Sequence, residues 1–170
     1  MRFMLIDRIT ELQPGASITA VKSLLPTEEY LIDHFPRFPV MPGVLMLEVM
    51  YEASAWLVRV SEDYHHAVIL LKEARNVKYA DFVEPGETLV VKSAIVKQEG
   101  SLTTLKSQGL VGDVLAVSGT LVLERFHVAD VHPQRAAWDA YARKKYRREF
   151  ESLFQPPTQP DTRALADHVA

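Results

Sequence analysis

The chain has 170 residues, 48% of them hydrophobic and 24% charged, and carries a formal net charge of -3. Its length predicts one domain with a sizeable hydrophobic core. The slightly acidic balance argues against a nucleic-acid partner, because such proteins usually present a strongly basic face. The sequence contains no cysteine, which excludes disulfides, thiolate metal ligands and a thiol nucleophile.

The N-terminal segment and the lengths of the apolar runs bear on the cellular location of the protein. The first apolar stretch, in MRFMLIDRIT, is shorter than that of a signal peptide and is interrupted by Asp7 and Arg8. The longest apolar runs fall short of the roughly 20 residues that a membrane span requires. We therefore expect a cytoplasmic protein without a membrane partner.

The first part of the chain predicts a strand, a loop and a helix. Residues 16–24 follow a Pro14-Gly15 turn and alternate apolar with polar side chains, which indicates a strand. Residues 26–42 are rich in proline and aromatic residues and form a loop. Residues 44–64 lack glycine and proline and carry apolar side chains on nearly every face, which predicts a buried helix.

After this helix the apolar residues recur at every second position, which predicts antiparallel strands. The strand segments are 66–72, 75–80, 88–97, 101–111 and 114–124. Gly112-Asp113 fits a tight two-residue hairpin turn, and the last strand is expected to place Leu115, Val117 and Leu121 on one face. The sheet and the buried helix can each cover the apolar face of the other. The pattern therefore predicts an α+β fold in which one antiparallel sheet wraps around one long central helix.

The C-terminal part differs in character. Apolar and aromatic residues, among them Trp138, Tyr141, Phe150 and Phe154, recur at helical spacing opposite a basic face. We predict an extra amphipathic helix over 133–154 that packs on the outer surface of the sheet or on a partner protomer, followed by a flexible tail. The chain is accordingly divided into a core domain, 1–126, and a helical extension with a tail, 127–170.

The segment HFPRFPVMPGVLMLE, residues 34–48, carries the candidate chemistry. His34 lies in a loop stiffened by prolines, and an imidazole, with an unperturbed pKa of about 6.5, can act as a base. Gly43 allows a ligand to approach its backbone N–H, which lies in the unsatisfied first turn of a helix, as an oxyanion hole requires. Glu48 lies about 7.5 Å further along the buried helix. Desolvation should raise its pKa and suit it to the role of general acid.

These residues closely resemble the signature of the beta-hydroxyacyl-acyl-carrier-protein dehydratases of type II fatty-acid synthesis, the FabZ-type enzymes of the hotdog superfamily. The signature reads His-Phe-Pro-Gly-x-Pro-x-Met-Pro-Gly-Val-Leu, with a Glu fourteen residues after the His. The matching residues here are His34, Phe35, Pro36, Pro39, Met41, Pro42, Gly43, Val44, Leu45 and Glu48. The segments LIDRITELQPG and NVKYADFVEPGE also resemble the family, so the likeness covers about residues 3–126. The chain departs from the family at Asp33 and Arg37, where Gly is usual, and at Glu52, where Gln is usual.

The resemblance implies a hotdog fold and the elimination of water from a (3R)-hydroxyacyl thioester carried by acyl carrier protein or coenzyme A. His34 would remove the C2 proton, Glu48 would protonate the departing hydroxyl, and the Gly43 N–H would polarise the thioester carbonyl. No cofactor is implied. The family further implies a homodimer or higher homo-oligomer in which the His and the Glu of one site come from different protomers.

The remaining expectations concern the surroundings of this site. The resemblance implies substrate contacts by Phe35, Pro42 and Val44, and Arg37 is a candidate contact for an anionic group. The pair His65-His66 shows no metal-ligand spacing, so the sequence predicts no metal site. Two alternatives to the dehydratase stay open: a non-catalytic hotdog protein that binds an acyl thioester, and a hotdog thioesterase.

Overall fold

The computed structural model describes residues 4–156, so the end of the predicted tail lies outside the described residues. Its six strands form one sheet in the order β1-β2-β4-β5-β6-β3, with every neighbouring pair antiparallel. The strands are β1 (Arg8–Gln13), β2 (Ser17–Ser23), β3 (Val68–Tyr79), β4 (Thr88–Glu99), β5 (Leu102–Val111) and β6 (Val114–Phe126). The helices are α1 (Gly43–Ser61) and α2 (Ala136–Leu153), with 3-10 turns η1 (Glu29–Leu31), η2 (Val128–Asp130) and η3 (Pro133–Arg135).

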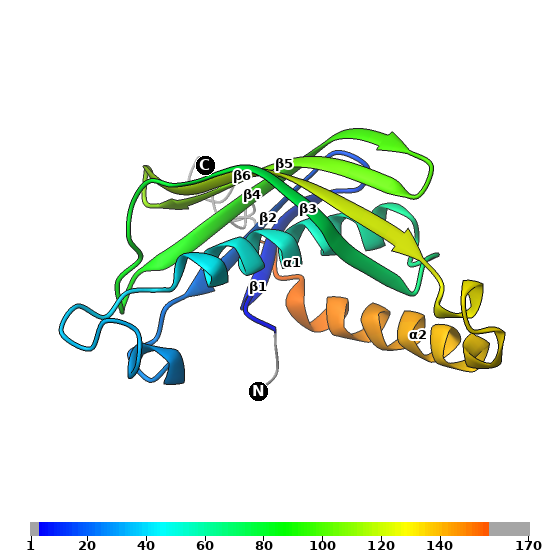
Figure 1. Ribbon diagram of the computed structural model, residues 1–170, viewed down its shortest axis with the longest axis horizontal. Coiled ribbons are helices and arrows are strands. Elements are labelled where there is room, and N and C mark those ends of the chain that lie inside the picture. The colour runs from blue at the N-terminus through cyan, green and yellow to red at the C-terminus, as the bar shows by residue number, and fades with distance from the viewer. Residues whose placement is uncertain (1–3, 157–170) are drawn as a thin grey trace, which may run out of the picture.

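Helix α1 crosses the inner face of the curved sheet, as Figure 1 shows. The side chains of Met46, Val49, Met50 and Leu57 are almost completely buried and belong to the hydrophobic core. These positions recur at helical spacing, which is why the helix is held by apolar burial against the strands. The predicted hotdog arrangement of one sheet around one long helix is confirmed. Within residues 4–156, no helix is long and apolar enough to cross a membrane.

A chain of three buried serines links α1 to the middle of the sheet. The Ser54 hydroxyl lies 3.0 Å from that of Ser93 on β4, which lies 2.6 Å from that of Ser107 on β5. The Ser54 hydroxyl also lies 2.7 Å from the carbonyl oxygen of Met50. Because an unsatisfied buried hydroxyl is costly, the three residues satisfy one another and fix the face that α1 presents to the strands.

The β5–β6 hairpin has the predicted turn, with Val111 paired to Val114 across Gly112 and Asp113. The pairing then shifts, because Gly109 is opposite Val117 while Leu110 is opposite Leu115, and Ala116 is left as an extra residue. Such a bulge reverses the alternation of faces. Leu115 is therefore 40% exposed, and its predicted place beside Val117 is wrong.

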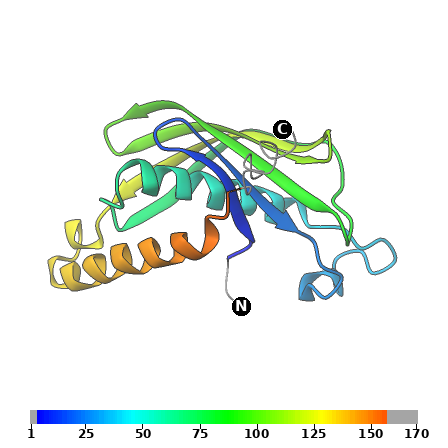
Figure 2. The ribbon, with the colours of Figure 1, turned by 180° about the vertical axis from the view of Figure 1, so that it is seen from behind.

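Helix α2 packs against α1 on the side that the sheet leaves open (Figure 1), so the predicted packing on the outer surface of the sheet is wrong, while packing on a partner protomer stays a prediction. The Trp56 ring meets the rings of Tyr146 and Phe150 at centroid distances of 6.0 and 6.1 Å. The Arg59 guanidinium lies 4.2 Å from the centroid of the Tyr146 ring. The C-terminal end of α2 reaches β1, as Figure 2 shows, where the N–H of Gln155 donates to the Ile9 oxygen. The sheet thus covers only part of the surface of α1.

The two ends of the aromatic face of α2 differ in burial. Phe150 stacks on Phe154 with a centroid distance of 5.3 Å, and both pack against the core. Trp138 and Tyr141 are 45% and 64% exposed, so the prediction that they are buried does not hold within this protomer. The helix is anchored by its second half. The division of the chain at residue 126 stays a prediction.

Replacing Phe150 by alanine should destabilise the fold, because its ring contacts Trp56, Tyr64 and Phe154. The loss of a large apolar side chain costs about 1.5–3 kcal/mol, which lowers Tm by roughly 3 °C or more in a chain of this size. Thermal unfolding of Phe150→Ala measures this, with Tyr141→Ala on the exposed part of the same helix as the control. Equal melting temperatures for the two variants would contradict the packing.

Candidate functional site

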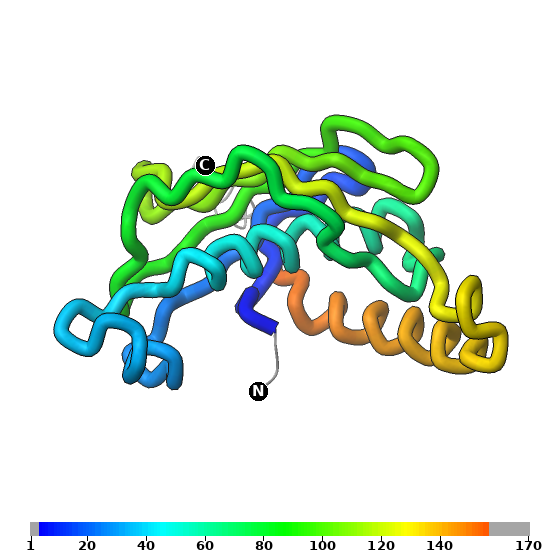
Figure 3. The backbone as a smooth tube through the Cα atoms, in the orientation of Figure 1, coloured from blue at the N-terminus to red at the C-terminus, as the bar shows by residue number. Residues whose placement is uncertain are grey.

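The loop before α1 forms one end of the molecule (Figure 3) and holds His34 through its backbone. The His34 N–H donates to the Tyr30 oxygen at 3.1 Å, and the Phe38 N–H closes a turn by donating to the Phe35 oxygen at 2.7 Å. Phe35 has a φ of 52°, a left-handed conformation that is uncommon for a residue with a side chain. Its ring centroid lies 4.4 Å from that of His34. The imidazole is half-buried and directed by these neighbours.

The start of α1 provides a backbone N–H beside the loop. Pro42 precedes the helix, and its carbonyl oxygen accepts bonds from the N–H groups of Leu45 and Met46. Gly43 is the first helical residue, so its N–H has no partner within the helix and lies at the positive end of the helix dipole. A Cβ at position 43 would stand 3.0 Å from a ring carbon of Tyr79. Only glycine fits there without moving that ring.

His34 and Gly43 line the same cavity, whose volume is about 330 Å³. The lining is mostly apolar and comes from the loop, the first turns of α1 and the end of β3. The lining residues are His34, Phe35, Val40, Met41, Gly43, Met46, Tyr79, Ala80, Asp81 and Phe82. An apolar cleft with one imidazole and one helix N-terminus suits a ligand with an aliphatic part and a carbonyl group.

The other predicted contacts are placed differently. Phe35 lines the cavity and Pro42 adjoins it at the start of α1, whereas Val44 is 70% exposed and is not among the lining residues. Arg37 is exposed in the turn between Phe35 and Phe38 and is also outside the lining. The prediction that Val44 and Arg37 contact substrate is therefore not supported by the cavity of this protomer.

Glu48 lies on the opposite side of α1 from the cavity. Two residues along an α-helix are turned by about 200° from each other, so Glu48 points away from the side on which Met46 lines the cavity. Burial raises the pKa of the Glu48 carboxyl above its ordinary value, which favours the neutral acid. The His34 and Glu48 side chains of one described protomer thus do not share the cavity.

Glu52, one turn after Glu48, holds the segment before β1. Its carboxylate accepts hydrogen bonds from the N–H of Leu5 at 2.9 Å and from the N–H of Ile6 at 3.0 Å. The side chain is buried. This burial raises the pKa of Glu52 to about 7, although the two N–H donors act in the opposite direction. Glu52 therefore serves as a backbone anchor.

Glu52 should make the stability of the protein depend on pH. Its pKa rises from 4.5 when unfolded to about 7 when folded, so between these values the folded state binds the proton more tightly. Glu52 therefore contributes up to about 3 kcal/mol to the free energy of unfolding below pH 4.5, and this contribution is lost as the pH rises to 7. The variant Glu52→Gln lacks this titration. Relative to wild type, its unfolding free energy should rise between pH 5 and 8, as denaturant titrations can measure. Parallel curves for the two proteins would contradict the assignment, and Glu151→Gln on α2 serves as an exposed control.

Sequence reasoning missed the wall of the cavity that comes from β3. Tyr79 and Phe82 are 50% and 56% exposed, and the Phe82 ring meets Phe38 edge-on at a centroid distance of 5.4 Å. The segment NVKYADFVEPGE did resemble the family, and its aromatic residues among polar ones were the available signal. Together with Phe35, these rings form an exposed apolar rim that is suited to cover by another surface.

Comparisons with known proteins place these features in a family. The sequence model for the FabA-like domain matches residues 1–120. A curated relative from Levilactobacillus brevis, named 3-hydroxyacyl-acyl-carrier-protein dehydratase FabZ, is 36% identical over 118 residues, which cover 69% of this chain and 80% of that protein. A relative of the same name from Clostridium kluyveri is 32% identical over 120 residues, which cover 71% of this chain and 83% of that protein.

Solved structures resemble the fold. A chain of the dehydratase heterocomplex ApeI:P from Xenorhabdus doucetiae superposes with a TM-score of 0.63 at 14% identity, over 79% of this chain and 90% of that one. A hypothetical thioesterase with coenzyme A from Streptococcus pneumoniae gives a TM-score of 0.53 at 10% identity, over 69% and 84%. At these identities the likeness concerns the fold alone. The family model covers the loop, α1 and every strand except the last part of β6. The chain therefore belongs to the family of FabA-like domains.

Proposed function

We propose that this protein is a dehydratase that converts a 3-hydroxyacyl thioester into the 2-enoyl thioester during acyl-chain synthesis. The observation that carries this proposal is the cavity that His34 and Gly43 both line, in which an imidazole and a helix N-terminus share one apolar cleft. The curated relatives bear the name of this activity and support it. The reaction loses one water molecule and needs a base, an acid and an oxyanion donor.

His34 takes the proton from C2 of the thioester. The electron pair of the C2–H bond delocalises onto the thioester oxygen, which the Gly43 N–H stabilises as negative charge develops. The C2=C3 bond then forms as the C3–O bond breaks. The neutral carboxyl of Glu48 donates its proton to the departing hydroxyl, which leaves as water. A proton passes from His34 back to Glu48 before the next turnover.

We infer that the Glu48 of each site comes from the partner protomer of a homodimer. Within one protomer Glu48 faces away from the side of α1 on which Met46 and Gly43 line the cavity. The rings of Phe35, Tyr79 and Phe82 form the exposed rim of the cavity, and Val44, which follows Gly43 on α1, is 70% exposed. A two-fold interface over this rim would bury apolar surface and bring a second α1 toward the cavity.

We infer that the acyl group is delivered on acyl carrier protein, as the names of the relatives indicate for those proteins. Coenzyme A is the competing carrier. A cytoplasmic location fits this chemistry. The walls of Val40, Met41 and Met46 suit the aliphatic part of the substrate.

The test of this function is incubation with a 3-hydroxyacyl thioester of acyl carrier protein, followed by the absorbance of the conjugated enoyl product. The same acyl group on coenzyme A forms a parallel arm, and the faster substrate identifies the carrier. Release of free thiol without enoyl product would instead identify a thioesterase. Tight binding with neither product would identify a non-catalytic acyl-thioester protein.

Mixing two inactive variants tests the shared site. His34→Ala and Glu48→Gln, coexpressed and purified as mixed dimers, would have one intact and one doubly altered site in each mixed dimer. Half of a random 1:1 population is mixed, so about one quarter of wild-type activity should return before the mixed dimers are separated and about one half in the purified mixed dimers. No recovery from verified mixed dimers would mean that both groups act from one chain.

A further inference from the structure

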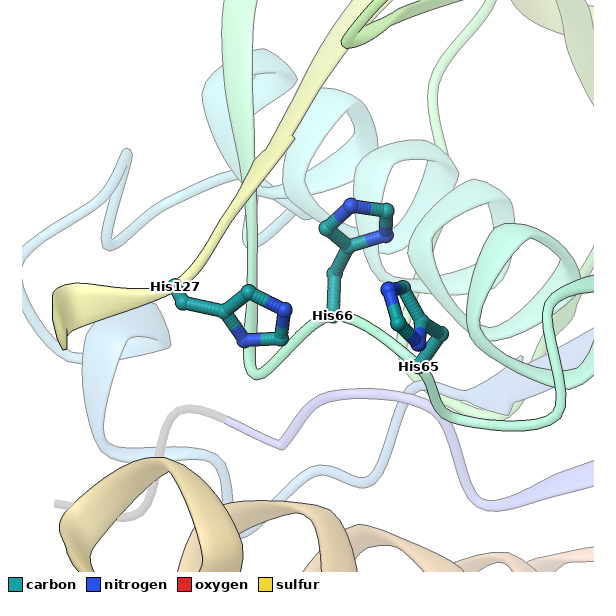
Figure 4. A group of neighbouring side chains, drawn as sticks. All are labelled: His65, His66 and His127. Atoms are coloured by element: carbon teal, nitrogen blue, oxygen red, sulfur yellow. The ribbon is translucent and has the colours of Figure 1, made fainter. Parts of the chain in front are cut away.

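Three histidines gather at the end of the molecule opposite the candidate site. His65 and His66 lie between α1 and β3, and His127 directly follows β6. One ring nitrogen from each residue lies within 4.8 Å of those of the other two. Figure 4 shows the three rings side by side, with those of His66 and His127 nearly parallel and that of His65 almost perpendicular to both.

The strand register explains why these distant residues meet. The β3–β6 ladder ends at the pair Val68 and Phe126, so the segment before β3 and the segment after β6 leave the sheet side by side. The chain reverses after α1 through Asp63 and Tyr64, which have φ values of 49° and 60°. This turn brings His65 to the same edge. The positions of His65 and His66 in the sequence do not predict that His127 lies beside them.

A carboxylate orients one of the rings. The Nδ1 of His66 lies 2.7 Å from an oxygen of Glu62, whose other oxygen is paired with the Arg125 guanidinium. An Nδ1–H that donates to Glu62 leaves the Nε2 lone pair of His66 free to bind a ligand. This carboxylate–histidine arrangement is the one that commonly supports metal-binding imidazoles. The Glu62 pairing also balances the charge of Arg125 close to the rings.

We propose that His65, His66 and His127 bind a divalent transition-metal ion of the zinc type. Neutral imidazoles suit Zn²⁺, Ni²⁺ and Cu²⁺ and do not suit Mg²⁺ or Ca²⁺. Zn–N bonds are about 2.0–2.1 Å long, which keeps two nitrogens on one ion within about 4 Å of each other. The rings therefore close by up to about 1 Å on binding, and the exposed His65 is free to rotate. Water completes the coordination.

The ion adds a link between elements that the ion pairs of Glu62 with Arg125 and of Asp63 with Arg147 already join. His65 and His66 follow the end of α1, and His127 leads into η2 and the start of α2. The cluster is separated from Gly43 by the whole of α1, which is 19 residues or about 28 Å long. The ion is thus a structural clamp between the helix end and the sheet edge, and its binding is independent of the proposed dehydration.

The experiment uses the untagged full chain after treatment with a chelator. Calorimetric titration with ZnCl₂ should show one ion per chain, and zinc should raise Tm, whereas MgCl₂ should do neither. His127→Ala should weaken zinc binding at least about tenfold, and Glu62→Gln should weaken it about 10–100-fold through the lost orientation of His66. The control is His132→Ala, an exposed histidine outside the cluster, which should bind zinc as the wild type does.

Two results would overturn the proposal. One is the absence of zinc binding to the folded wild-type chain in the calorimeter. The other is zinc binding of equal affinity by wild type and His127→Ala, since the ligands would then lie elsewhere. Circular dichroism of each variant establishes that it is folded before titration.

Discussion

Replacing Glu48 by glutamine should lower kcat for dehydration by about 10²–10⁴-fold while the fold is retained. The amide has the size of the carboxyl but no acidic proton, so the hydroxyl would have to leave without protonation. Burial raises the pKa of Glu48, which indicates that its surroundings accept a neutral side chain. The rate of enoyl formation measures the loss, and thermal unfolding checks the fold.

The matched control for this variant is Glu151→Gln, which alters an exposed glutamate on α2. Its turnover should equal that of wild type. If Glu48→Gln kept wild-type turnover, Glu48 would not be the acid. A loss shared by both variants would point to a general effect of charge.

Replacing His34 by alanine should reduce kcat by a similar factor, about 10²–10⁴-fold, because among residues 4–156 it removes the only imidazole that lines the cavity. The half-buried ring leaves space beside Phe35, so added imidazole should restore part of the rate. Such rescue separates loss of a base from loss of structure. The control is His132→Ala, which lies outside the cavity and should turn over normally. Full activity of His34→Ala would remove His34 from the mechanism.

Strands β2, β4, β5 and β6 and helix α1 were predictable because their apolar residues alternate or recur in ways that only those elements satisfy. Strand β1 was not predicted, and the two predicted segments 66–72 and 75–80 form the single strand β3. The segment 34–48 likewise carried the candidate site, because Pro42, Gly43 and the loop act locally. Tyr79 was not predictable as the neighbour of Gly43, since that approach depends on where β3 ends beside α1. The wrong placement of Leu115 comes from the single extra residue Ala116. This bulge residue turns Leu115 to the opposite face of the sheet, although nothing in the alternation of apolar and polar residues marks it.

The packing of α2 on the outer surface of the sheet was predicted wrongly because the sequence suggested that the sheet covers α1 completely. The face of α1 with Trp56 and Arg59 is instead covered by Tyr146 and Phe150. A helix that is apolar nearly all round shows that it is buried, but does not show which elements bury it. The proximity of His127 to His66 was hidden for a similar reason, because it follows from the register of β3 and β6.

The buried serine chain has a consequence for the alignment of the proposed catalytic groups. Moving α1 by one residue would shift Ser54 by about 1.5 Å and turn it by about 100°. The hydrogen bond between the Ser54 and Ser93 hydroxyls would then be lost, at a cost of about 0.5–1.5 kcal/mol, while the Ser93–Ser107 bond within the sheet would remain. Apolar contacts have no direction and tolerate small rotations of a helix. The angle at which α1 presents Gly43 to the cavity and Glu48 to the opposite side of the helix is therefore set by a polar contact in the middle of the core.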